Sequence, residues 1–253
     1  MRILLSSLFI LLSLSQHALA QYYSLTQPRG YIQRAYVKYY DTDTVTIVTG
    51  YGECNGEYWE IVSDTNHDMT SLASAEDYHY IYIDYSASSF PTITVIDTTT
   101  EPVWSDAKQG WYNGDDRCLG VVWSPSGSAT VFNFATDGDG RYWTTTTNIK
   151  QLVDDADPTG NYVSLEATAY SPVNSNALLV SGRALDSDGN VTILIQPAEE
   201  TYAELCGDGH SGYANVQGWM PIQIGWSRDL EWYGNDDDDS DVRIQIWGYR
   251  IER

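Results

Sequence analysis

Apolar and polar residues alternate with a period of two along most of this chain, a pattern that predicts β-strands rather than helices. The clearest example is the segment 78–85, in which tyrosines alternate with isoleucines. We expect this strand to have one apolar face. Its two faces are predicted to be Tyr78, Tyr80, Tyr82 and Asp84 on one side and His79, Ile81, Ile83 and Tyr85 on the other.

Other segments rich in Val, Ile, Thr, Tyr and Trp also fit a pleated, half-buried strand surface. They lie at 45–48, 92–96, 119–123, 129–134, 162–169, 177–180, 191–195, 220–226 and 242–251. Turns rich in glycine and aspartate separate them. Only the segments 71–76 and 148–153 resemble short helical turns. The predicted fold class is therefore all-β, of the β-sandwich type.

A change in composition at 154–160 predicts a domain boundary. Aspartates cluster there with Pro158 and Gly160, and the strand alternation stops. Boundaries between domains usually fall in such polar, turn-rich segments. We therefore expect two β-sandwich, jelly-roll-like domains in tandem, at 21–155 and 156–253.

The last predicted strand has two contrasting faces. The apolar face, which we expect in the core, carries Val242, Ile244 and Ile246. The other face is predicted to carry Arg243, Gln245, Trp247, Tyr249 and Ile251. Because large aromatic rings are unusual on an ordinary solvent face, we expect this second face to be a subunit contact or to be covered by a loop.

The first 20 residues are typical of a secretory signal peptide. Arg2 precedes an apolar run at 3–14, and Ala18-Leu19-Ala20 matches a small-x-small cleavage site before Gln21. The alternative is a membrane anchor, but the apolar run is shorter than the roughly 20 residues that span a bilayer. We expect the mature protein to be secreted, with no membrane insertion.

The chain is strongly acidic, with 13 Lys and Arg against 35 Asp and Glu and a net charge of −22. Removal of Arg2 with the leader changes this charge to −23. Such a surface disfavours nucleic acid, whose binding depends on cationic contacts to phosphate. It also disfavours binding to anionic membranes.

Three cysteines, Cys54, Cys118 and Cys206, are too few and too widely spaced for a metal finger or a disulfide scaffold. An oxidising compartment permits one disulfide and one remaining thiol. The alternative, a buried thiol that packs as a small apolar group, is favoured for at least one of them.

Signals for catalysis are weak. The mature histidines are His67, His79 and His210, and no G-x-S-x-G motif is present. His79 lies in a predicted strand and is expected to be packed there. Cys206 and His210 are close enough in sequence for a catalytic Cys–His pair, but their glycine-rich stretch fits a flexible loop equally well. Glycoside hydrolysis needs only two suitably spaced carboxyl groups, so the many acids do not point to it. Tryptophans that suit sugar stacking are plentiful, namely Trp104, Trp111, Trp123, Trp143 and Trp219. We expect no enzyme activity and no catalytic residues.

Two aspartate-rich segments, 137–139 and 186–190, place oxygen groups at alternate positions, as calcium loops do. Neither has a full calcium-binding loop, and Asp-Gly also closes hairpins for backbone reasons alone. We therefore expect no metal site and no cofactor, although the sequence leaves calcium open.

The best candidate for a binding site is the segment 104–116, between two predicted strands. It combines aromatic rings with carboxylates and an amide, a combination that suits neutral sugars. The candidate residues are Trp104, Asp106, Trp111, Tyr112, Asn113 and Asp115. The alternative is that Trp104 and Trp111 pack a long loop against the sandwich.

Several segments, read in order, resemble the distal receptor-binding regions of bacteriophage tail-fibre-type proteins. The matching segments are 43–47, 50–54, 78–83, 116–122, 126–134, 138–143, 163–169, Pro172, 177–180, 222–233 and 242–250 with its Gly248-Tyr249 pair. The resemblance implies β-sandwich domains, a trimer, and binding of a surface glycan or protein without cleavage. The signal peptide and the lack of a shaft sequence ahead of Tyr31 depart from the family pattern, so the resemblance points to a secreted cellular relative.

Together these observations favour a secreted, non-enzymatic recognition protein, adhesin-like or carbohydrate-binding and tail-fibre-like. Its expected partner is a cell-surface glycan or surface protein, and a homo-oligomer, with a trimer favoured by the resemblance, is expected. A second hypothesis is a structural extracellular protein that assembles into a surface layer or filament. A third is a secreted glycoside hydrolase.

Overall fold

The computed structural model describes ten stretches of the chain. They are residues 29–69, 76–125, 130–144, 149–156, 160–185, 191–198, 205–209, 213–222, 228–234 and 241–253. The predicted signal peptide lies outside them, as do residues 71–75 of the possible helical turn at 71–76 and the aspartate-rich segment 186–190.

The fold is all-β, as predicted. The described residues form strands and one short 3-10 helix, Thr168–Tyr170. The strands are β1 (Ile32–Gln33), β2 (Val37–Tyr39), β3 (Thr44–Ile47), β4 (Gly50–Cys54), β5 (Glu57–Ile61), β6 (Thr65–Asp68), β7 (Asp77–Ile83), β8 (Val95–Thr98), β9 (Val103–Ser105), β10 (Gly110–Asn113), β11 (Asp116–Ser124), β12 (Ala135–Thr136), β13 (Arg141–Trp143), β14 (Lys150–Ala156), β15 (Val163–Leu165), β16 (Ser175–Leu185), β17 (Val191–Pro197), β18 (Leu205–Gly209), β19 (Tyr213–Pro221), β20 (Leu230–Gly234) and β21 (Asp241–Ile251).

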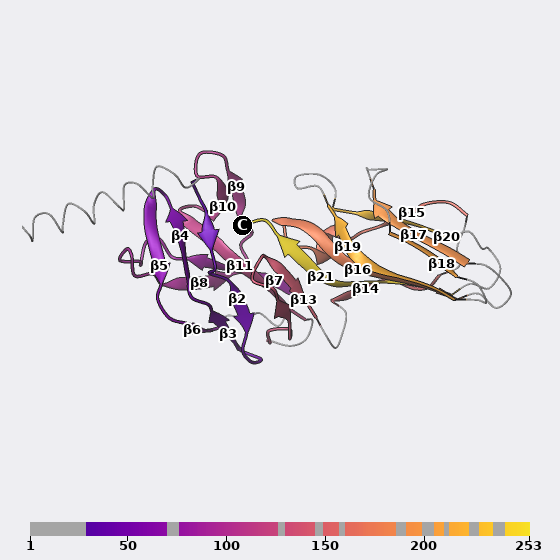
Figure 1. The fold of residues 1–253 in the computed structure, drawn as a ribbon, viewed down its shortest axis with the longest axis horizontal. Coiled ribbons are helices and arrows are strands. Elements are labelled where there is room, and N and C mark those ends of the chain that lie inside the picture. The colour runs from indigo at the N-terminus through magenta and orange to yellow at the C-terminus, as the bar shows by residue number, and fades with distance from the viewer. Residues whose placement is uncertain are drawn as a thin grey trace, which may run out of the picture.

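Three antiparallel sheets form the N-terminal part of the molecule, at the left of Figure 1. The largest has the strand order β8-β7-β11-β10-β9, and two smaller sheets have the orders β1-β4-β5 and β2-β3-β6. A side chain at Gly120 of β11 would collide with Val37 of β2, so the large sheet and one small sheet approach closely there. Trp59 and Ile81 lie fully buried within the core.

Two sheets face each other in the C-terminal part. One has the order β12-β13-β21-β16-β19, with β14 also paired to β21, and the other has the order β15-β20-β17-β18. Gly182 of β16 lies against Ile193 and Ile195 of β17, so the lack of a side chain on β16 allows the two layers to pack closely. This face-to-face arrangement is a β-sandwich.

Strand β21 runs through the C-terminal part of the molecule, and its end lies next to the N-terminal part in Figure 1. It pairs with β13 and β14 on one side and with β16 on the other. Strand β14 runs through residue 155, and one sheet contains strands from both sides of the predicted boundary. The division into two domains at this residue remains a prediction about folding units.

Strand β7 differs from the prediction of a single apolar face, because both of its faces are buried. The isoleucine face lies in the core as expected, and Tyr78, Tyr80 and Tyr82 are also buried. Each tyrosine hydroxyl has a backbone partner: Tyr78 donates to Tyr170 O (2.6 Å), and Tyr82 donates to Thr100 O (2.7 Å). Tyr80 accepts from the backbone N–H of Val173 (3.2 Å). These bonds permit the burial of a polar face, which alternation alone did not predict.

The register of β21 confirms one expected face and corrects the other. Val242, Ile244 and Ile246 are fully buried, as predicted. Tyr249 and Ile251 were expected beside Trp247 on the opposite face, but they are buried. The pairing with β16 skips one residue between Ile246 and Gly248, and such a bulge exchanges the two faces of the strand beyond it.

Two further sequence expectations are wrong. The segment 148–153 was expected to be helical, but its last residues belong to β14, which pairs with β21. The segment 129–134 was expected to be a strand, but residues 131–134 lie outside any strand and only β12 follows them. In the first place the pairing with β21, which local composition does not reveal, determines the outcome. In the second, the backbone N–H groups of Val131 and Phe132 donate singly to Thr42 O (2.7 Å) and Trp123 O (2.9 Å) instead of joining a strand.

Candidate functional site

The segment predicted to bind a ligand, 104–116, forms a β-hairpin instead of the expected loop. Strand β9 pairs with β10, and β10 pairs in turn with β11. The polar run that suggested a loop is only the turn between β9 and β10. Gly114, at the next turn, has a left-handed φ of 63°, which glycine adopts at little cost.

The three aromatic residues of this hairpin differ in exposure. The exposed fraction is 37% for Trp104 but only 5% for Trp111 and 3% for Tyr112. The Trp111 ring meets Trp104 edge-to-face at 5.7 Å between centroids, and its indole N–H donates to Glu252 (3.2 Å). Two of the three rings expected to contact a ligand therefore pack inside the molecule, as in the alternative interpretation of this segment, and Trp104 alone remains at the surface.

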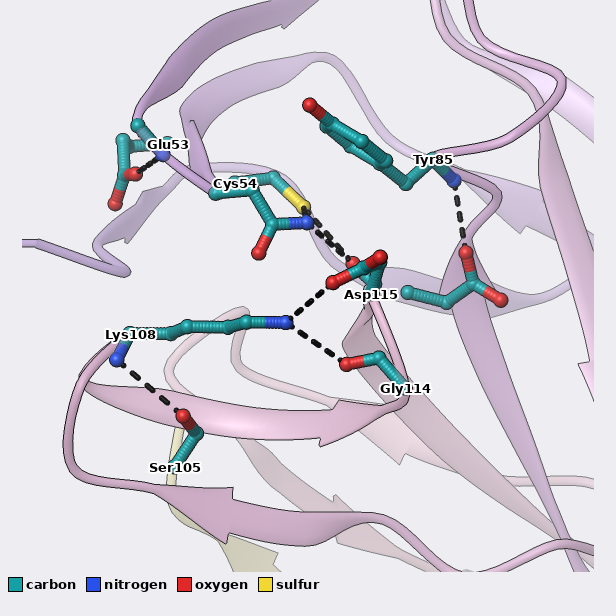
Figure 2. Close-up of polar contacts among 10 residues, drawn as sticks. Glu53, Cys54, Tyr85, Ser105, Lys108, Gly114 and Asp115 are labelled. Carbon is teal, nitrogen blue, oxygen red and sulfur yellow. Dashed lines mark hydrogen bonds and ion pairs between the residues drawn. The ribbon is translucent and has the colours of Figure 1, made fainter.

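The polar groups of the hairpin mainly bind other parts of the hairpin. Asp106 accepts a hydrogen bond from the Trp104 indole (2.8 Å). Lys108 donates to Gly114 O (2.9 Å) and forms an ion pair with Asp115 (2.7 Å), as Figure 2 shows. Asn113 ends β10 opposite Asp116. These contacts hold the two turns in place, and ligand binding at the predicted residues remains a prediction.

A buried guanidinium fixes the base of this hairpin. Arg117 is fully buried and donates to Trp111 O (3.0 Å) and Gly30 O (2.9 Å). Burial lowers the pKa of Arg117 and raises the pKa of the Cys54 thiol beside it to about 12. Burial also raises the pKa of Cys118 to about 12. At neutral pH these two thiols are protonated and inert as nucleophiles, so they pack as small apolar groups.

The histidines do not form a catalytic pair in the described residues. His79 is buried, as predicted, and neither of its ring nitrogens has a hydrogen-bond partner among them. His67 contacts Asp97 at 2.8 Å between Nε2 and Oδ1. Cys206 is exposed on β18, whereas His210 lies outside the described residues, so the proposed proximity of these two groups stays untested.

A groove of about 390 Å³ lies between β5, β6 and the segment 91–95. Its walls are mainly apolar and include Ile61, Val62, Ile93 and Val95. His67 lies at the wall, with its imidazole held by Asp97. Its lining also includes polar residues, among them Glu60, Asn66 and His67, but no tryptophan.

A second hollow, of about 530 Å³, opens on the outer face of the sheet that contains β21. Trp143 of β13 and Trp219 of β19 line it, together with Leu179 of β16. The register places these residues in one row, because Trp143 pairs with Gly248, Gly248 with Leu179, and Leu179 with Trp219. Since glycine has no side chain, β21 adds none to this row. Both indole rings are half-buried at the surface.

Polar groups surround the two indole rings. Arg141 forms an ion pair with Asp137 (3.1 Å), and its guanidinium carbon lies 5.8 Å from the centroid of the Trp219 ring. Partial burial raises the pKa of Asp137, but hydrogen bonds from the backbone of Asp139 and Arg141 and from the Arg141 side chain outweigh this, so its net pKa lies below the usual value. Gln217 adds a neutral amide. The hollow therefore combines aromatic surface, hydrogen-bonding groups and a neutralised charge pair.

The sequence named both Trp143 and Trp219 as rings that suit sugar stacking but did not bring them together. They are 76 positions apart in the chain and meet only through the pairing of β13, β21, β16 and β19. The sequence held one signal for this site. Arg141 and Trp143 are two positions apart on one strand, as are Gln217 and Trp219 on another, so each polar residue shares a strand face with a tryptophan.

The aspartate-rich turn at 137–139 fits a backbone role, since Asp137 accepts a hydrogen bond from Asp139 N (2.9 Å). Within the described stretches, no group of three or more His, Cys, Asp or Glu side chains is arranged to hold a metal ion. In the same part of the chain, no helix has the length and apolar character to cross a membrane.

No protein-family model matches the chain, and no curated protein matches it significantly.

Proposed function

We propose that this protein is a secreted, non-enzymatic recognition protein that binds a neutral carbohydrate in the hollow between Trp143 and Trp219. The observation that carries the proposal is the placement of two indole rings on one sheet face with Asp137, Arg141 and Gln217 beside them. Indole faces stack on the apolar faces of sugar rings, and the polar groups donate to and accept from sugar hydroxyls. Pockets that combine apolar surface with a few placed polar groups are typical binding sites.

The charge of the protein supports a neutral ligand. The chain carries −22, so an anionic polysaccharide is repelled at long range. Among the described residues that line the hollow, Arg141 is the cation, and it is already paired with Asp137. The ligand is therefore held by stacking and hydrogen bonds rather than by charge.

The remaining parts of the proposal rest on the sequence. The leader at 1–20 supports secretion, and the resemblance to tail-fibre receptor-binding regions supports an adhesin-like role on a cell-surface glycan. The same resemblance supports a homo-oligomer, with a trimer favoured.

The test uses a neutral glycan array followed by calorimetry on the best binder. Trp219→Ala is expected to weaken binding about tenfold or more, because tryptophans at the centre of binding sites often contribute 2 kcal/mol or more, and 1.4 kcal/mol corresponds to tenfold. Its melting temperature is expected to change little, because the ring is only half-buried.

The matched control is Trp104→Ala, which removes a surface indole from the β9–β10 hairpin. It is expected to leave affinity unchanged. If Trp104→Ala abolishes binding and Trp219→Ala does not, the binding site is the hairpin, and its assignment to the hollow is wrong. The absence of binding to any neutral glycan would refute the proposed function itself.

A further inference from the structure

We infer that the ligand is a linear chain of neutral sugars that lies along β16, β19 and β21, extending well beyond the hollow. This inference rests on the proposed function and specifies its ligand class. A single terminal sugar would need only the hollow, whereas the outer sheet face continues the same kinds of side chain over a much longer distance. All the residues that carry this inference lie in the described stretches of the chain.

Strict alternation creates this outer face. On β16 from residue 178, on β19, and on β21 as far as Ile246, even-numbered side chains point into the core and odd-numbered ones point outward. The outward side chains of β16, β19 and β21, together with those of β13 and β14, are here named the outer strip. They include Ser181, Tyr213, Gln217, Trp219, Gln245 and Trp247.

The centre of the outer strip is a row of neutral polar side chains beside the hollow. Gln151 pairs with Gln245, Gln245 with Ser181, and Ser181 with Gln217. Gln245 donates to Gln151 (3.3 Å), and Trp247 lies over the row with its indole N–H bonded to Ser181 (2.8 Å). Amides and hydroxyls both donate and accept, as sugar hydroxyls require.

The far end of the outer strip carries another aromatic ring. Tyr213 is 49% exposed and stands beside Arg183, whose guanidinium carbon lies 6.0 Å from the ring centroid. Tyr213 and Trp219 are six residues apart on β19, which corresponds to roughly 20 Å at about 3.3 Å per residue. Rings at both ends with amides between them fit an extended chain of several sugar units.

The composition of this face favours a sugar chain over a second protein copy. Protein interfaces have an apolar centre and a polar rim, whereas the centre here is the row of amides and hydroxyls. Of its three arginines, Arg141 is paired with Asp137 and Arg243 with Asp154, while Arg183 lies against the Tyr213 ring. Neighbouring acids therefore offset two of these three charges.

The test measures affinity against chain length. The probes are linear oligosaccharides of two to six units prepared from cellulose, xylan, mannan and dextran, titrated into the full protein. In at least one series we expect affinity to rise tenfold or more from two to six units. Tyr213→Ala, which removes the ring at the far end of the outer strip, is expected to remove most of this gain.

Tyr58→Ala is the matched control, because Tyr58 is 48% exposed, like Tyr213, but lies on β5. It is expected to preserve the gain. If two-unit and six-unit probes bind equally, this inference is wrong while sugar binding in the hollow stands. If no probe of any length binds, both fail. If the protein is an oligomer that Tyr213→Glu converts to monomers, the outer strip is an interface between copies and the inference is also wrong.

Discussion

His79 shows how a single residue links burial to pH. Its side chain is 1% exposed, and both ring nitrogens are unpartnered among the described residues. Burial lowers its pKa below 6.5, and Asp97 and Asp77, which favour the charged form, do not offset this. The folded state therefore holds a neutral imidazole at a pH where the unfolded chain already binds a proton.

This difference predicts a pH-dependent stability. As pH falls below about 6.5, His79 binds a proton in the unfolded state but stays neutral in the folded state. The free energy of unfolding therefore decreases until the pH reaches the lowered pKa of His79 in the folded state. Each unit of pKa difference corresponds to about 1.4 kcal/mol. Urea denaturation between pH 7.5 and 5 should show a shallower decline for His79→Gln than for the natural chain, with a constant difference above pH 7. Parallel curves over the whole range would exclude this role for His79.

Among the strands, β21 allows a direct test of its assigned register, that is, of which of its residues face the core. Ile244 is fully buried, so Ile244→Ala is expected to lower the free energy of unfolding by about 2–5 kcal/mol. The neighbouring Gln245 points to the outer strip, and Gln245→Ala is expected to cost less than about 1 kcal/mol. Chemical denaturation of both variants measures the contrast. Equal losses, or a larger loss for Gln245→Ala, would show that the register is shifted by one residue.

The same strand shows how far sequence reasoning reaches. Alternation predicted the buried face up to Ile246 correctly because period and burial agree there. It failed at Tyr249 because a bulge is set by pairing with β16, which leaves no local mark in the sequence. The hairpin β9–β10 was missed for a related reason: its turn is rich in charge and its strands are short. The hollow could not be predicted, because Trp143 and Trp219 become neighbours only through three strand pairings.

At the scale of the whole molecule, a tyrosine cluster joins the two parts. Tyr249 of β21 stacks on Tyr142 at 5.5 Å between centroids and meets Tyr78 of β7 edge-to-face at 5.5 Å. Its hydroxyl donates to Val121 O of β11 (3.1 Å). The last strand of one sheet is thereby anchored to the central strands of another.

This anchoring predicts that the two parts unfold together. Calorimetry is expected to show one transition, with calorimetric and van't Hoff enthalpies that agree. Tyr249→Phe keeps the ring and removes one hydrogen bond, so it is expected to lower stability by about 1 kcal/mol without dividing the transition. Two separate transitions in the natural chain would show instead that the predicted domains at 21–155 and 156–253 are independent.

The position of β21 also sets an order in time. It is the last described strand, yet it occupies the middle of its sheet, between β13 and β14 on one side and β16 on the other. During synthesis, β13, β14 and β16 are therefore made before β21, the strand with which all three pair. Pairings between distant segments also form slowly. Until residues 241–251 have been made, the edges of β13, β14 and β16 stay unpaired, so this sheet is completed only after those residues emerge.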